Sequence, residues 1–234
     1  MSQFIAVSRA IFTTVCIIVV SAQTGSAQEA TGSPAKTKVV CFGDSITKRG
    51  YSEVLSKTLG VEAINAGVAG NSTAQALRRL SSDVLAHSPD IVVILFGTND
   101  LRADAERVYV PVDKYKSNLE SMIAKCRKGG SRIILCTLPP IQHDAFFTRH
   151  KREQFDALGG LGKMIESYRQ AARQVAAQQK TKLVDLNDLL AKEPKWLSKD
   201  GVHPTTNGTA IIAKHIAKAI KSLAPAKNRQ DPPQ

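Results

Sequence analysis

Hydrophobic and polar positions follow a regular pattern along this chain, in which a short apolar run precedes a longer amphipathic segment. Several of the apolar runs are rich in valine and isoleucine with little polar alternation, which is typical of strands buried on both faces of a parallel sheet. The pattern therefore predicts five parallel strands. They are Lys38 to Phe42, Val61 to Asn65, Ile91 to Phe96, Arg132 to Thr137 and Lys182 to Leu186.

The segments between these runs have apolar residues at helical spacing, as at Leu77, Leu80 and Val84. Glycines and prolines stand where helices usually end and begin. The predicted helices are Tyr51 to Leu59, Ser72 to Ala86, Val112 to Arg127, Leu161 to Gln179 and Thr206 to Leu223. Strands that alternate with helices over short connections predict an α/β fold. We expect a three-layer α/β/α sandwich around a doubly wound parallel five-stranded sheet, in the order 2-1-3-4-5.

One connection, Leu138 to Gly160, is much longer than the others and shows no regular pattern, so we predict an irregular segment there. Ligands of doubly wound folds bind at the carboxyl ends of the strands, which is the edge where this segment begins. Loops of this length usually have a function. We therefore expect the segment, which carries His143 and His150, to line a substrate cleft.

The first 27 residues have the composition of a secretory signal peptide. Residues 1–9 carry one positive charge and no acidic residue, and residues 10–22 are almost entirely apolar. That apolar run is too short to span a bilayer, and small residues at Gly25 to Ala27 suit signal peptidase. We predict cleavage after Ala27 and a secreted or periplasmic protein with no membrane span after processing. An uncleaved anchor helix is the alternative.

The domain organisation follows from these boundaries. We predict a signal peptide (1–27), a linker (28–37), one domain with its own hydrophobic core (38–223) and a disordered Pro- and Gln-rich tail (224–234). The chain has a net charge of +12, and loss of Arg9 with the signal peptide leaves +11. Such a charge favours anionic surfaces, but the basic residues are dispersed and form no nucleic-acid motif. Nucleic acid is therefore not an expected partner.

Three cysteines remain after the predicted cleavage: Cys41, Cys126 and Cys136. In the predicted strand order, Cys41 and Cys136 lie two strand spacings apart, roughly 9 to 10 Å. That separation exceeds the reach of a disulfide bond. We predict buried free thiols.

Residues that can take part in chemistry directly follow the predicted strands. Ser45 comes after the first strand and before the first helix, where free N–H groups favour developing negative charge. A serine at this position is also a common helix cap. Gly67 follows the second strand and Asn99 the third. At one sheet edge, the Ser45 amide, the Gly67 amide and the Asn99 side chain would form a three-donor oxyanion hole.

A serine nucleophile needs a base. His203 follows the fifth strand in an Asp-x-x-His-Pro run, and Asp200 can fold back to hold one imidazole nitrogen while the other faces Ser45. His143 and His150 are the rival bases. The sequence has no His-Glu-x-x-His, paired Cys-x-x-Cys or Gly-x-Gly-x-x-Gly motif, so we expect no metal site and no phosphate-binding loop of that type.

Four ordered blocks of this chain resemble those of the SGNH, or GDSL, hydrolase superfamily. They are Gly43 to Thr47, Asn65 to Gly67, Gly97 to Asp100 and Asp200 to Pro204. The resemblance extends from about Lys38 to Leu223 and implies a flavodoxin-like sandwich that hydrolyses carboxylic esters or thioesters without a cofactor. It also implies roles for the matching residues: Ser45 as nucleophile, His203 as general acid and base, Asp200 as its orienting group, and Gly67 and Asn99 with the Ser45 amide as the oxyanion hole.

The substrate is the least determined part, because similar members of this superfamily act on acetylated sugars, lysophospholipids, thioesters and aryl esters. Export favours extracellular polymers or envelope lipids over cytosolic thioesters. We expect a small-molecule or polysaccharide ester as the substrate, and our first prediction is deacetylation of a glycan. The alternative is a lysophospholipase or thioesterase-like lipid esterase, and the non-enzyme alternative is a basic binding protein for anionic polymers. The candidate substrate-binding residues are Asp44, Asp100, Arg102, His143 and His150.

Overall fold

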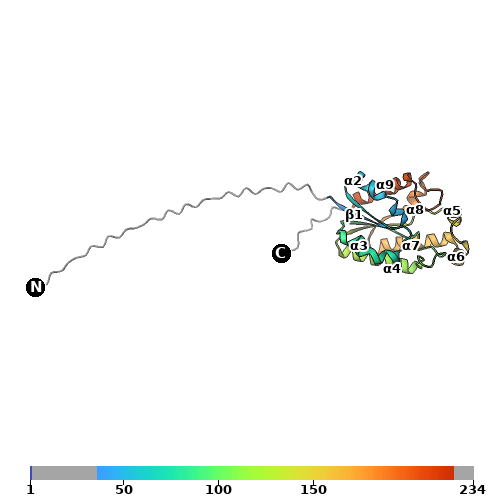
Figure 1. Ribbon diagram of the computed structural model, residues 1–234, viewed down its shortest axis with the longest axis horizontal. Helices are drawn as coiled ribbons and strands as arrows, with labels where there is room; N and C mark the ends of the chain where they lie inside the picture. Colours follow the sequence, from blue (N-terminus) through green and yellow to red (C-terminus); the bar gives the residue numbers. More distant parts are fainter. Residues whose placement is uncertain (2–35, 224–234) are drawn as a thin grey trace. The chain divides into compact units, whose positions relative to one another are not determined.

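A computed structural model describes residue 1 and residues 36–223 of the protein (Figure 1). The predicted signal peptide, its cleavage after Ala27, most of the linker and the tail of residues 224–234 lie outside the described residues. Residues 36–223 belong to one compact unit. Within it, no helix is both long enough and apolar enough to cross a membrane.

The sheet has five parallel strands in the order β2-β1-β3-β4-β5, which confirms the predicted topology. The strands are β1 (Lys38–Gly43), β2 (Glu62–Gly67), β3 (Ile91–Leu95), β4 (Arg132–Cys136) and β5 (Lys182–Val184). Because successive side chains of a strand point to opposite faces, the central strands supply two separate cores. Val40 and Phe42 of β1 contribute to one core, and Val39 and Cys41 to the other.

Helices cover both faces of the sheet, so the fold is the predicted three-layer sandwich (Figure 1). On one face lie α3 (Thr73–Asp83), α4 (Val112–Lys128) and α7 (Leu161–Gln178). On the other lie α2 (Tyr51–Leu59), α8 (Leu186–Leu190) and α9 (Thr206–Ser222). The remaining helical pieces are α1 (Ser45–Lys48), a 3-10 turn (Leu85–His87), α5 (His143–Phe147) and α6 (Arg152–Asp156).

The expectation that Leu138 to Gly160 is irregular was wrong, because α5 and α6 lie within it. Gln142 caps α5 by accepting a hydrogen bond from the Ala145 amide at 3.1 Å. The rings of Phe146 and Phe155 then pack edge to face, with centroids 5.4 Å apart. Local capping and aromatic contacts therefore stabilise helices that are too short to show a helical period.

Two other predicted elements end two or more residues earlier than expected. The fifth strand ends at Val184 rather than Leu186, since the Asp185 side chain caps α8. The second predicted helix ends at Asp83, and its last residues form the 3-10 turn.

The cysteines agree with the prediction. Cys41, Cys126 and Cys136 are buried and free. Burial raises the pKa of all three thiols. They are therefore core residues rather than nucleophiles.

Candidate active site

The carboxyl ends of the first three strands bring the sequence blocks to one edge of the sheet. Gly43 at the end of β1 is in register with Gly67 of β2 on one side and with Leu95 of β3 on the other. The segments that carry Ser45, Gly67 and Asn99 therefore leave the sheet side by side.

The turn after β1 places Ser45 at the first position of α1. The helix cap is Asp44, not Ser45, because Oδ1 of Asp44 accepts a hydrogen bond from the Ile46 amide at 2.9 Å. Gly43 permits this sharp turn, since a Cβ there would lie 1.9 Å from Oγ1 of Thr47 and 2.6 Å from the Leu95 carbonyl oxygen. The Ser45 hydroxyl is thus left available for another partner.

That partner is His203. Its Nε2 lies 2.8 Å from Oγ of Ser45, and its Nδ1 lies 2.6 Å from Oδ2 of Asp200. An ionised carboxylate only accepts hydrogen bonds, so Nδ1 carries a proton and the neutral ring accepts at Nε2. The structure therefore brings Ser45, His203 and Asp200 together in the geometry of a serine hydrolase triad.

The pKa of Asp200 lies well below its ordinary value. Partial burial acts to raise this pKa, but hydrogen bonds from the backbone amides of His203 and Val202 and from the Ser198 hydroxyl outweigh it. Asp200 is consequently ionised at neutral pH, as a group that orients an imidazole must be.

The loop that carries Asp200 and His203 is held at both ends and in the middle. Leu197 and Pro204 form an antiparallel bridge, and the Ser198 amide donates to the His203 carbonyl at 2.9 Å. Gly201, at φ 74°, packs so closely that a Cβ would lie 2.7 Å from the Gln142 carbonyl oxygen. The loop therefore rests directly on the segment before α5.

The three candidate oxyanion donors lie at this edge, and two of them, the Gly67 amide and the Asn99 side chain, have protein partners of their own. The Gly67 amide donates to Oδ1 of Asn65 at 3.1 Å. Nδ2 of Asn99 donates to the Asn71 carbonyl at 3.1 Å and to Oδ2 of Asp44 at 3.3 Å. An oxyanion bound here has to share or replace these contacts.

Gly67 also approaches the backbone of α1 closely. A Cβ at Gly67 would lie 2.3 Å from the Lys48 amide nitrogen and 2.8 Å from its Cα. Only glycine at position 67 allows β2 to lie this close to α1, the short helix that begins at Ser45.

Two candidate substrate-binding residues differ from the prediction, because their side chains lie inside the protein. Asp44 is 1% exposed and Asp100 is 0% exposed. Oδ1 of Asp100 accepts hydrogen bonds from the amide and the hydroxyl of Thr73. Burial raises the pKa of each carboxyl to about 7. Both residues therefore support the site from beneath rather than contacting a substrate.

The other three candidates lie on two neighbouring segments. Nε of Arg102 is 2.7 Å from Asp104, and Nδ1 of His150 is 3.0 Å from the same carboxylate. The His150 ring also stacks on Phe146, with centroids 4.1 Å apart, and burial lowers its pKa. His143 is exposed at the start of α5. The hydrogen-bond partner of Ser45 is His203 and neither of the rival bases.

Residues outside the four blocks also contact the site. The Ser198 hydroxyl donates to Asp200 at 2.7 Å, and Nη2 of Arg149 donates to the Asp200 carbonyl at 2.8 Å. Arg79 of α3 donates to the Gly43 and Ala66 carbonyls. No sequence signal marks these three residues. Arg149 and Arg79 bind backbone carbonyls that are distant in the sequence, and Ser198 lies in a turn without periodicity.

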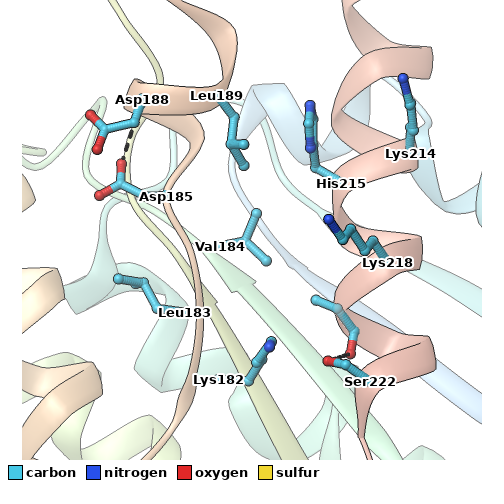
Figure 2. Close-up of a pocket in the computed structure, with 11 residues that line it drawn as sticks. Lys182, Leu183, Val184, Asp185, Asp188, Leu189, Lys214, His215, Lys218 and Ser222 are labelled. Atoms are coloured by element: carbon cyan, nitrogen blue, oxygen red, sulfur yellow. Dashed lines mark hydrogen bonds between the residues drawn. The ribbon is translucent and has the colours of Figure 1, made fainter.

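A separate hollow, the β5–α9 groove, has a volume of about 670 Å³ and contains none of the triad or oxyanion residues. Figure 2 shows Lys218 and His215 of α9 on one side of it and Val184 of β5 on the other. Lys182 and Lys214 add further positive charge to its lining. Among the described residues, no cluster of His, Cys, Asp and Glu that could hold a metal ion is present.

Comparison with known proteins defines the class. The crystal structure of the lipase/acylhydrolase from Enterococcus faecalis matches with a TM-score of 0.67 and 26% identity, covering 82% of this chain and 99% of that chain. The acetylxylan esterase of Geobacillus stearothermophilus is 25% identical over 73% of this chain and 77% of its own length. The protein is a carboxylic ester hydrolase on a three-layer α/β/α sandwich.

The chain belongs to the GDSL-like Lipase/Acylhydrolase family, whose model matches residues 41–211. A relative from Bacillus subtilis (strain 168), the uncharacterized lipoprotein YqeF, is 32% identical over 76% of this chain and 87% of its own length. The matched range includes all four blocks on which the resemblance rested.

Proposed function

We propose that this protein is an exported serine esterase that removes acetyl or other short acyl groups from a carbohydrate, with Ser45 as its nucleophile. The observation that carries the proposal is the pair of contacts at His203, 2.8 Å to Ser45 and 2.6 Å to Asp200. This arrangement activates a hydroxyl and stabilises the imidazolium that forms when its proton is transferred.

The reaction has two steps. Oγ of Ser45 attacks the ester carbonyl carbon while Nε2 of His203 takes its proton, and the oxyanion lies against the amides of Ser45 and Gly67 and the side chain of Asn99. The C–O bond to the alcohol then breaks as His203 returns the proton to the leaving oxygen. Water repeats the cycle on the acyl-enzyme, which releases the carboxylic acid and restores the Ser45 hydroxyl.

The glycan substrate and the extracytoplasmic location have separate support. The acetylxylan esterase relative supports an acetylated polysaccharide. The N-terminal composition and the lipoprotein relative support export. The lipase/acylhydrolase structure favours the second candidate, a lipid esterase, which would prefer longer acyl chains.

The test is a series of nitrophenyl esters from acetate to palmitate, run beside acetylated xylan. Wild type, Ser45→Ala and the matched control Ser117→Ala are compared, since Ser117 is an exposed serine of α4. We expect a preference for acetate, release of acetate from the glycan, and loss of both activities in Ser45→Ala alone. Activity that rises with acyl length would favour the lipid esterase, and full activity of Ser45→Ala would exclude the serine mechanism.

A further inference from the structure

Arg79 makes an unusual set of contacts for a residue outside the four blocks. Its side chain is 15% exposed. Nε donates to Oδ1 of Asn71 at 2.7 Å, Nη1 donates to the Ala66 carbonyl at 2.9 Å, and Nη2 donates to the Gly43 carbonyl at 2.9 Å. The guanidinium carbon lies 4.6 Å from the centre of the Phe42 ring. All three guanidinium nitrogens and one face of the group are therefore engaged.

Each acceptor belongs to a segment that carries one of the proposed oxyanion donors. Gly43 ends the strand that leads into Ser45. The Ala66 carbonyl and the Gly67 amide belong to the same peptide unit. Asn71, which accepts through its side chain from Arg79, accepts through its carbonyl from the Asn99 amide at 3.1 Å. Arg79 thus binds directly to the segments that carry Ser45 and Gly67, and it is linked to Asn99 through Asn71.

We propose that Arg79 is a positioning residue of the esterase, which aligns the oxyanion donors and strengthens the Gly67 amide as a donor. The inference rests on the proposed function. A guanidinium holds its donors in a rigid planar fork, so it fixes the relative positions of the backbone groups that it binds. A hydrogen bond to a peptide carbonyl also polarises that peptide, which makes its N–H group a better donor.

The contacts of Arg79 exceed what a surface ion pair needs. Among the residues that the structure describes, its carboxylate partner is Asp83, one turn along α3, at 2.9 Å. Its other bonds leave the helix and reach the ends of β1 and β2 and the loop after β2. Preorganised donors of this kind stabilise the charge that develops in a transition state more than they stabilise bound substrate.

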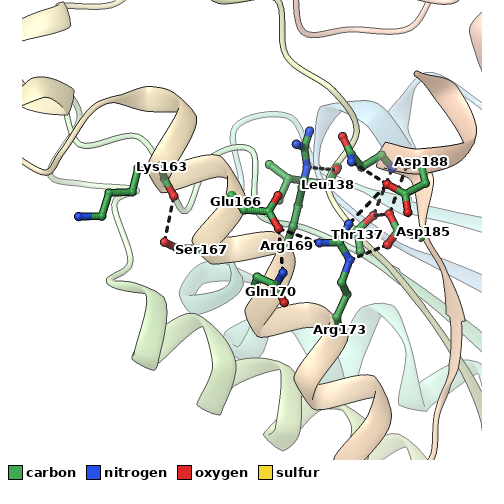
Figure 3. Close-up of polar contacts among 11 residues, drawn as sticks. Thr137, Leu138, Lys163, Glu166, Ser167, Arg169, Gln170, Arg173, Asp185 and Asp188 are labelled. Atoms are coloured by element: carbon green, nitrogen blue, oxygen red, sulfur yellow. Dashed lines mark hydrogen bonds and ion pairs between the residues drawn. The ribbon is translucent and has the colours of Figure 1, made fainter. Parts of the chain in front are cut away.

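Arg173 of α7 offers a matched control. It is 24% exposed and contacts three carboxylates, those of Glu166, Asp185 and Asp188, as Figure 3 shows. Like Arg79 it is a partly exposed helical arginine that binds several groups at once, but none of these three carboxylates belongs to a loop that carries a triad or oxyanion residue.

The experiment compares Arg79→Gln, Arg79→Lys and Arg173→Gln with wild type on nitrophenyl acetate. For Arg79→Gln we expect kcat to fall by about 10- to 100-fold while KM changes less than about threefold, because alignment of oxyanion donors acts on the transition state. Arg79→Lys should recover part of the loss, since it keeps a charge but not the fork. Arg173→Gln should stay within about twofold of wild type.

Two further readouts separate alignment from folding. A trifluoromethyl ketone, which forms an oxyanion on Ser45, should lose affinity in Arg79→Gln in proportion to kcat. Added guanidinium ion at non-denaturing concentration should restore part of the activity of Arg79→Ala, and should do nothing for Arg173→Ala. Melting temperatures of all variants show whether a loss of activity follows a loss of structure.

The proposal is overturned if Arg79→Gln and Arg173→Gln lose kcat equally, if Arg79→Gln changes KM alone, or if ketone affinity is unaffected. It is also overturned if neither Arg79→Lys nor guanidinium ion restores any activity. An inactive Ser45→Ala together with a fully active Arg79→Gln would remove this inference and leave the proposed function standing. An active Ser45→Ala would remove both.

Discussion

At the scale of single residues, the contacts of His203 distinguish it from the other described histidines. His150 shares a carboxylate with Arg102, His143 is exposed, and Nε2 of His215 is buried without a hydrogen-bond partner among the described residues. His203 alone has Ser45 on one ring nitrogen and Asp200 on the other. The role of each histidine therefore depends on the residues that surround it.

This difference predicts the outcome of histidine replacement. His203→Ala should lower kcat on nitrophenyl acetate by at least about 10³-fold, because the serine loses its base. His143→Ala and His150→Ala should stay within about threefold of wild type, since neither contacts Ser45. Steady-state kinetics of the purified variants checks this. A loss in His150→Ala as large as that in His203→Ala would contradict the assignment.

The neighbouring aspartates show why the sequence predicted some site residues and misplaced others. Asp200 was predicted through its spacing from His203, which is a local property of one turn. Asp44 and Asp100 also stand beside catalytic blocks, yet their side chains turn inward, to the Ile46 amide and to Thr73. The direction in which a side chain points depends on tertiary packing, so a short sequence motif does not predict it.

At the scale of elements, the close passage of β2 over α1 connects packing to catalysis. Gly67→Ala would place a Cβ 2.3 Å from the Lys48 amide nitrogen, so strand and helix have to separate. Overpacking of this kind costs about 1–3 kcal/mol. We expect a lower melting temperature and a kcat reduced by at least about 10-fold, since the amides of Ser45 and Gly67 both move.

Gly162→Ala in α7 is the matched control for this substitution. Gly162 lies in the first turn of α7, where a Cβ meets only the exposed His143 ring, at 3.3 Å, and a glycine-to-alanine change at a compatible backbone position stabilises by up to about 1 kcal/mol. Thermal unfolding and nitrophenyl acetate kinetics should therefore show a stability close to or above that of wild type with unchanged activity. Equal effects in the two variants would show that close passage at Gly67 is unimportant.

The elements that could be predicted from sequence share one property, a hydrophobic pattern that extends over the whole element. Several strands were located because their runs are almost entirely apolar, and the long helices because their apolar residues recur on one face. The four-residue α1 and the five-residue α5, α6 and α8 span too few turns to show a period. They depend on side-chain caps such as Gln142 and Asp185 and on aromatic contacts made across the chain.

At the scale of the whole molecule, the two buried carboxyls influence the free energy of unfolding. A carboxyl in an unfolded chain has a pKa of about 3.9. Burial raises the pKa of Asp44 and of Asp100 to about 7 in the folded protein. Between these values the folded state keeps protons that the unfolded state releases. A rise in pH from about 4 to about 7 therefore favours unfolding, and no further change from these groups follows above about 7.

Asp100→Asn should remove one of the two contributions. The amide keeps an acceptor for the Thr73 amide and hydroxyl at Oδ1, and its NH₂ group takes the place of Oδ2, a buried atom without a hydrogen-bond partner among the described residues. The substitution also removes a negative charge that helps to raise the pKa of Asp44. The stability of the variant should consequently fall less than that of wild type as the pH rises.

The measurement is thermal unfolding of wild type, Asp100→Asn and Asp156→Asn at several values from pH 4 to pH 8. Asp156 is exposed on α6, so its variant should follow wild type. As the pH rises across this range, the unfolding free energy of Asp100→Asn should increase relative to that of wild type by up to about 4 kcal/mol. The pKa of Asp100 is raised by about three units on folding, and each unit corresponds to about 1.4 kcal/mol. A difference that is constant from pH 4 to pH 8 would show that Asp100 is ionised in the folded protein throughout. The Asp100 carboxylate, which accepts hydrogen bonds from Thr73, would then carry a charge whose burial the fold offsets by other means.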